Sequence, residues 1–111
     1  MIKKDNFDKE LQQLADFSRI LSHPARLAIL KFLSETKSCI SGDISDSLPL
    51  SRSTVSQHLK ELRDIGLIHG EIDGLKINYC LCSEKLEFFG QLFDDFYSNV
   101  RNGANDCSRG C

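Results

Sequence analysis

The chain has 111 residues, with 14 basic and 16 acidic side chains for a formal net charge of −2, 41% hydrophobic residues and five cysteines. A chain of this length folds as one small domain with a single core, which disfavours an enzyme with a deep cleft between two domains. No apolar run reaches the roughly 18 residues that a membrane helix requires, and mixed charges at 1–6 replace the apolar core of an export signal, so we expect a cytoplasmic protein.

Two helices are predicted in the first third of the chain. Apolar residues recur at spacings of three and four over 7–21, which is the pattern of a helix with one apolar face. His23-Pro24 ends this helix, because proline disfavours helix at the preceding residue but suits the first turn of a new one. A second helix is expected over 24–35. Apolar residues cover more than half of its circumference, which predicts the most buried helix of the fold.

The middle of the chain predicts two short helices joined by a tight turn. A connector over 36–41 leads into the first of them, at 41–48, which Pro49 stops. Ser51 supplies the N-cap of the second helix, and Gly66 supplies its C-terminal stop. Three apolar residues share one face of this second helix and are expected to face the core: Val55, Leu59 and Leu62.

A hairpin and a last helix complete the predicted fold. Residues 67–72 and 76–81 have the composition of two strands, with Asp73-Gly74 as a favoured hairpin turn. A two-stranded hairpin is marginal alone, so it needs a helix to pack against. Apolar spacing over 86–100 then predicts a long helix rich in phenylalanine.

This order of elements is the plan of a winged helix-turn-helix domain, a mainly α fold with a β-hairpin wing that reads duplex DNA. The helix that begins after Ser51 is the candidate reading helix, and no acidic residue occurs from 51 through 60. Arginine there can pair with guanine, glutamine can pair with adenine, and hydroxyls suit phosphate oxygens. The candidate DNA-binding residues are Arg52, Ser53, Thr54, Ser56, Gln57, His58 and Lys60, with Lys76 on the wing.

Several alternatives stay open for this surface. The polar face can be an ordinary solvated helix face. His58 can pack inside the fold instead of touching DNA, and Arg26 can hold either a phosphate or a partner within the fold. Residues 51–76 carry four basic and four acidic side chains, so a winged-helix module that binds protein is also compatible with the sequence. Glu71 and Asp73 would repel phosphate and limit the wing to a weak contact.

Two motifs resemble those of the ArsR/SmtB-type bacterial repressors. Residues 48–68, LPLSRSTVSQHLKELRDIGLI, are similar to the family signature LGLSQSTVSxHLxxLRxAGLV. Residues 21–30, LSHPARLAIL, are similar to the family segment LaxPtRLxIL. The resemblance covers roughly 7–97. It implies a dimeric winged-helix repressor that binds an imperfectly palindromic operator in double-stranded DNA and is released by a metal, a metalloid or a redox signal.

A homodimer is also expected from the residues themselves. The first and last helices each carry an apolar stripe, and a chain this small has one core in which to hide them. Pairing through the N- and C-terminal helices across a two-fold axis would bury the surplus. Two reading helices about 34 Å apart could then occupy successive major grooves. The alternative is that both stripes close the core of a monomer.

The cysteines suggest a sensor. In a cytoplasmic protein, thiols, metal ligands or redox sensors are expected before structural disulfides. The resemblance implies a Cys-x-Cys metal motif near Cys39, but serine stands at position 41. A folded domain over 1–101 leaves a flexible tail at 102–111 that ends in two cysteines. Cys107, Cys111 and Cys39 are therefore the candidate ligands for a soft inducer such as As(III), Cd(II) or Pb(II).

Other uses of the cysteines are weighed against this site. One alternative is that the same sulfurs form a disulfide on oxidation. The other is that the cysteines have no sensing role, which leaves a repressor with no metal response. Cys80 and Cys82 share a strand face, and packing is favoured over chelation. A thiol redox enzyme is disfavoured, because no Cys-x-x-Cys motif occurs. No triad order or glycine-rich phosphate loop occurs either, so we predict no catalytic activity and no required cofactor.

Overall fold

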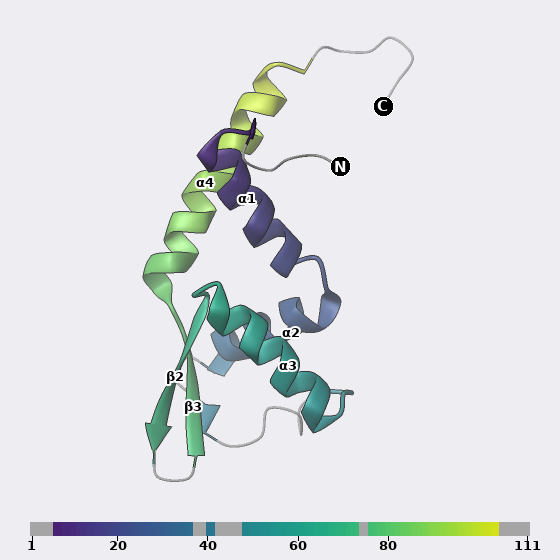
Figure 1. Ribbon diagram of the computed structural model, residues 1–111, viewed down its shortest axis with the longest axis vertical. Coiled ribbons are helices and arrows are strands. Elements are labelled where there is room, and N and C mark those ends of the chain that lie inside the picture. The colour runs from purple at the N-terminus through teal and green to yellow at the C-terminus, as the bar shows by residue number, and fades with distance from the viewer. Residues whose placement is uncertain (1–5, 37–39, 42–47, 74–75, 105–111) are drawn as a thin grey trace.

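The computed structural model describes residues 6–36, 40–41, 48–73 and 76–104, drawn as coloured ribbon in Figure 1. Within them the fold is mainly helical with an antiparallel hairpin, as predicted. None of the helices in these ranges is long and apolar enough to cross a membrane. The elements are α1 (Lys9–Ile20), α2 (Pro24–Thr36), β1 (Ile40–Ser41), α3 (Arg52–Asp64), β2 (Ile68–Asp73), β3 (Lys76–Leu81) and α4 (Ser83–Asn102).

The predicted ends of α3 are confirmed by its caps. Ser51 is the N-cap, and its side chain accepts the backbone N–H of Thr54 at 3.3 Å. Gly66 follows the last turn with φ +90°, a conformation that glycine adopts at little cost. The N–H of Leu67 then bonds back to the carbonyl of Leu62 at 3.0 Å, which closes a Schellman motif. The short helix expected at 41–48 falls almost wholly on 42–47, outside the described residues.

The core forms where α1, α2, α3 and β2 meet. Its buried members are Phe17, Ile20, Ile29, Leu33, Val55, Leu59, Leu62, Leu67 and Ile68. The three residues predicted for the inner face of α3 are all among them. The expectation that α2 is the most buried helix is wrong: α2 buries two residues and α3 buries four. Leu27 on α2 is 50% exposed, and the described elements that pack most against α2 are α3 and β3.

The strands form one antiparallel sheet in the order β1-β3-β2. β2 and β3 pair from Ile68 with Leu81 to Asp73 with Lys76. Asp73 is therefore a strand residue and not part of the turn, whose two positions between 73 and 76 lie outside the described residues. β1 was not expected: it replaces the end of the predicted connector and pairs Ile40 with Tyr79.

The first and last helices, α1 and α4, lie side by side (Figure 1). The ring of Phe17 on α1 stacks on Phe89 of α4, with 4.7 Å between centroids. Further along α4, Phe93 packs against Phe89 with 6.2 Å between centroids and stacks on Tyr97 at 6.0 Å. No residue of α4 is buried in the part of the chain that the structure describes. Its aromatic rings thus extend well beyond what α1 covers.

A polar cluster joins α1, α2 and α3 beside the apolar core. Arg26 donates from Nε to Nδ1 of His58 at 3.1 Å, and from Nη1 to the carbonyl of Ile20 at 3.1 Å. The His23 ring packs against the His58 ring with 4.4 Å between centroids. His58 is 6% exposed. One guanidinium therefore satisfies acceptors on two other elements and holds α3 in place.

This environment favours the neutral form of His58. Burial lowers the pKa of His58 below its usual 6.5, and the charges of His23 and Arg26 lower it further, against an opposing effect of Glu61. A proton on Nδ1 would also remove the acceptor that Arg26 uses. The folded state thus binds this proton less readily than the unfolded chain does.

The free energy of unfolding is expected to fall as the pH is lowered below about 6.5, because His58 takes up a proton more readily in the unfolded state. Urea unfolding followed by far-ultraviolet circular dichroism between pH 7.5 and 5 measures this. His58→Gln should reduce the slope. The matched variant His69→Gln, which changes an exposed histidine, should keep it. An identical slope in wild type and His58→Gln would contradict the assignment.

Candidate nucleic-acid interface

The outer face of α3 presents the polar side chains that the sequence predicted for it. The side chains exposed to solvent are Arg52, Ser53, Ser56, Gln57 and Lys60. Val55 and Leu59 hold the opposite face in the core, at 2% and 6% exposure. The first two turns of the helix carry no acid, and the N–H groups of its first turn point out of the N-terminal end. Such an end attracts phosphate oxygens.

The N-terminal end of α3 is ordered by hydroxyl groups. Ser51 donates to Oγ1 of Thr54 at 2.9 Å and also lies 3.3 Å from Oγ of Ser53. Thr54 is half-buried, so its side chain is less accessible than those of its neighbours. The capping network therefore fixes the hydroxyls of the first turn before any ligand arrives.

Two polar side chains of the face bind acids one turn further along. Nε2 of Gln57 donates to Glu61 at 3.3 Å, and Nζ of Lys60 forms an ion pair with Asp64 at 3.0 Å. The ion pair is more than half exposed on both sides, and such surface pairs contribute about 0–1 kcal/mol. Both contacts are weak enough to be exchanged for a base or a phosphate. The spacing of four residues in the sequence is the signal that could have revealed them.

Three other candidates lie elsewhere. His58 is buried, and Arg26 is half-buried and hydrogen-bonded to it. Each of the two residues therefore has a partner within the fold, as one of the two interpretations of the sequence expected. Lys76 is on β3 opposite Asp73, but its side chain is not among those that the structure describes. The candidate interface on the described residues is accordingly the N-terminal half of α3.

The cysteines separate into two groups. Cys39, Cys107 and Cys111 lie outside the described residues, so their role as inducer ligands stays a prediction. Cys82 is a free thiol at the N-cap of α4, beyond the end of β3. Cys80 is buried and takes part in a disulfide with a partner outside the described residues. The two do not form a chelating pair on one strand face, and a disulfide departs from the expected thiol.

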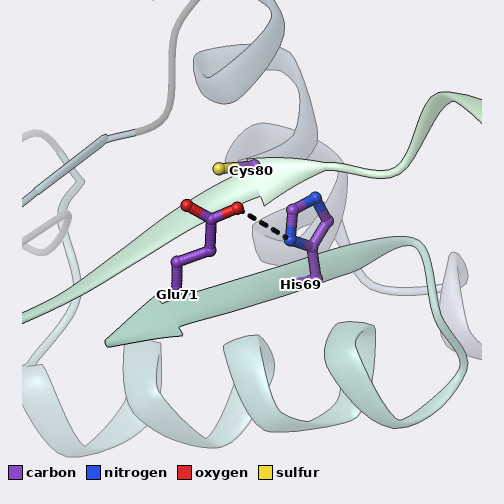
Figure 2. Close-up of side chains that lie close together, drawn as sticks. All are labelled: His69, Glu71 and Cys80. Atoms are coloured by element: carbon purple, nitrogen blue, oxygen red, sulfur yellow. Dashed lines mark ion pairs between the residues drawn. The ribbon is translucent and has the colours of Figure 1, made fainter. Parts of the chain in front are cut away.

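A second group of polar side chains on the wing was missed at the sequence level. His69 and Glu71 extend from β2 toward Cys80 on β3, as Figure 2 shows. One ligand atom from each, an imidazole nitrogen, a carboxylate oxygen and the sulfur, lie within 4.8 Å of one another. The hairpin register, which pairs His69 with Cys80, was the signal that could have revealed the group.

Known proteins match this chain over a region that includes α2 and α3. A family model described as bacterial regulatory protein, arsR family, matches residues 23–69. The chain is 38% identical over 73 residues to the HTH-type transcriptional regulator YgaV of Escherichia coli, covering 66% of this chain and 74% of that one. It is 34% identical over 83 residues to the arsenical resistance operon repressor of Staphylococcus xylosus, covering 75% and 79%. The chain also matches the HTH-type transcriptional repressor SmtB of Mycobacterium tuberculosis, but it spans only 56% of the length of that protein.

The fold also matches solved structures. An ArsR-like transcriptional regulator from Rhodococcus sp. superimposes with a TM-score of 0.68 at 24% sequence identity, over 81% of this chain and 84% of the other. At that identity the likeness establishes the fold. The family model covers α2, β1 and α3, and the N-terminal half of α3 forms the exposed polar face.

Proposed function

Because this chain belongs to the arsR family of bacterial regulatory proteins and is a DNA-binding transcriptional regulator, we propose that it is a cytoplasmic homodimeric repressor. Its two α3 helices would enter successive major grooves of an imperfectly palindromic operator. The domain over 1–101 would supply both the DNA-binding and the dimer surfaces. The observation that supports this most is the outer face of α3, exposed and free of acids over its first two turns.

The chemistry of that face matches an operator. Arg52 would pair with a guanine and Gln57 with an adenine, because both project from the half of α3 that would enter the groove. Ser53, Thr54 and Ser56 would bind phosphate or base edges, and Lys60 a phosphate. Lys76 would add a backbone contact from the wing. Gln57 and Lys60 would exchange their acidic partners for DNA on binding.

Dimerisation is supported by the surface that α1 and α4 leave uncovered. The large apolar residues on these helices that are at least 42% exposed are Leu11, Phe88, Phe93, Phe96, Tyr97 and Val100. A twenty-residue helix with this composition and no buried residue is unusual for a stable monomer. A second copy related by a two-fold axis would cover the stripe and set the spacing of the two α3 helices.

We also propose that the repressor releases DNA on binding a thiophilic metal or metalloid, or on oxidation. The regulator from Staphylococcus xylosus is named for arsenical resistance, and soft thiolate ligands suit As(III), Cd(II) and Pb(II). Cys39, Cys107 and Cys111 are the ligands proposed, with the last two in a tail over 102–111. A repressor with no metal response is the alternative.

Arg52→Ala and Gln57→Ala should each reduce discrimination between the operator and a scrambled duplex by about 1–3 kcal/mol, roughly five- to 150-fold. The operator is first selected from random duplexes, and binding is followed by fluorescence anisotropy. The matched variant Arg63→Ala removes an exposed basic side chain from the C-terminal end of α3 and should leave discrimination unchanged. Full discrimination in both test variants would refute the reading helix. Wild-type binding that is insensitive to salt would favour the protein-binding alternative.

Phe93→Glu should convert the dimer to a monomer, because it places a charge in the proposed apolar interface. Light scattering after size-exclusion chromatography gives the mass. Ile72→Glu makes the same change on the wing, where the side chain is 84% exposed, and should leave a dimer. Circular dichroism confirms that each variant is folded. A wild-type monomer, or a dimeric and folded Phe93→Glu, would exclude this interface.

Arsenite or cadmium should release the operator from the reduced wild-type protein, since a bound ion would stabilise a state with lower affinity for DNA. Titration with arsenite, cadmium, zinc, copper(I) and peroxide is followed by anisotropy. Truncation after Asp106 should weaken release if Cys107 and Cys111 are ligands. Truncation after Cys107 removes one of the two and is the intermediate control. If none of the agents releases DNA, the sensor proposal fails and the repressor proposal stands.

A further inference from the structure

Four polar side chains share one face of the wing. Residues directly opposite each other in an antiparallel pair point to the same side, as do alternate residues of one strand. The register pairs His69 with Cys80 and Glu71 with Asn78. These four residues therefore form a compact block across β2 and β3, on the side opposite Ile68, which is buried in the core.

Three of them bring together the donor atoms of a metal site. Nδ1 of His69 lies 3.9 Å from Oε1 of Glu71, and Sγ of Cys80 completes a group whose atoms are within 4.8 Å of one another (Figure 2). Imidazole nitrogen, carboxylate oxygen and thiolate sulfur are the ligands that zinc takes in proteins. Cys80 is 7% exposed, whereas the side chains of His69 and Glu71 are 51% and 64% exposed. The group thus has a buried sulfur at its base and an open side toward solvent.

Asn78 supplies an independent observation. Its Oδ1 atom is buried and has no hydrogen-bond partner in the part of the chain that the structure describes. Asn78 lies opposite Glu71 and two residues before Cys80, on the central strand of the sheet. A buried acceptor without a donor costs about 1–3 kcal/mol. A cation on the same face would offset part of that cost, because the amide oxygen carries partial negative charge.

We propose that the reduced chain binds one zinc-like divalent cation, zinc(II) or cadmium(II), at this wing site through Cys80, His69 and Glu71. The sulfur ligand favours these ions over magnesium and calcium, which prefer oxygen donors alone. Three protein ligands leave a fourth position of a tetrahedral ion to solvent, on the open side of the group. The site uses none of Cys39, Cys107 and Cys111 as a ligand, and it does not depend on DNA binding.

The disulfide at Cys80 makes this site sensitive to oxidation. A sulfur bonded to another sulfur cannot act as a thiolate ligand. A dithiol reductant supplies two electrons and two protons, which yields the Cys80 thiol, the partner thiol and the oxidised, cyclic form of the reductant. The thiol then releases its proton to water as the ion binds. Peroxide can take back the two electrons and two protons, which reforms the disulfide and yields two waters, and this removes one of the three ligands and expels the ion.

Cadmium titration of the reduced protein tests the site directly. A background with Cys39, Cys107 and Cys111 changed to serine retains Cys80 and Cys82 and removes the other soft ligands. One cadmium per chain should bind, with a sulfur-to-cadmium charge-transfer band in the ultraviolet. Cys80→Ser should abolish the band. His69→Ala and Glu71→Gln should each weaken binding by at least about 100-fold, since even outer-shell partners of a metal are worth 10–100-fold.

Cys82→Ser is the matched control, because it removes a free thiol two residues away and should retain full affinity. Circular dichroism confirms that the variants are folded, and wild-type protein is titrated in parallel with and without a dithiol. Unchanged binding in Cys80→Ser, or an equal loss in Cys82→Ser, would overturn the site. Equal affinity of reduced and oxidised wild type would overturn its dependence on the thiolate. DNA is absent from these measurements, so their failure is distinct from failure of the repressor proposal.

Discussion

The burial of one face of α3 is the constraint on which the rest of the structure depends. Val55, Leu59 and Leu62 are between 0% and 6% exposed, and burying an aliphatic side chain of this size is worth about 1.5–3 kcal/mol. With 3.6 residues per turn, this choice leaves Ser53 and Gln57 on the opposite side. Rotation of α3 by one position would bury polar side chains and expose apolar ones. The core therefore determines which face DNA can reach.

The apolar contacts fix the rotation of α3, and the cluster around Arg26 holds α1 and α2 against it. The guanidinium binds the end of α1 through the carbonyl of Ile20 and binds α3 through His58. Each acceptor would be costly to leave without a donor once half-buried. His58 is thus a structural residue within a motif whose other polar members face outward. From the sequence, His58 could either contact DNA or pack within the fold, because the direction of a side chain near the edge of a helix face depends on what packs there.

Features that depend on neighbouring residues were predicted from the sequence, whereas features that depend on distant ones were missed. The caps at Ser51 and Gly66 and the apolar spacings placed α1, α2, α3 and α4 within a few residues. The hairpin turn was placed one residue early, which would pair His69 with Asn78 instead of Cys80 and conceal the wing group. β1 was missed because a strand of two residues is too short to show an alternation of apolar and polar residues. The burial of α2 was overestimated, since periodicity counts apolar residues and not what covers them.

The helix, the wing and α4 meet at one buried junction. Leu67 is fully buried; its N–H bonds to the last turn of α3, and its carbonyl accepts the N–H of Cys82 at the start of α4 at 2.9 Å. Lys85 of α4 packs close to Gly66, within 3.0 Å of where a β-carbon would lie. A close-packed junction transmits small shifts because it has no space to absorb them. An ion bound on β3 and a second copy bound along α4 would thus both act on α3 through Gly66 and Leu67, which follow its last turn.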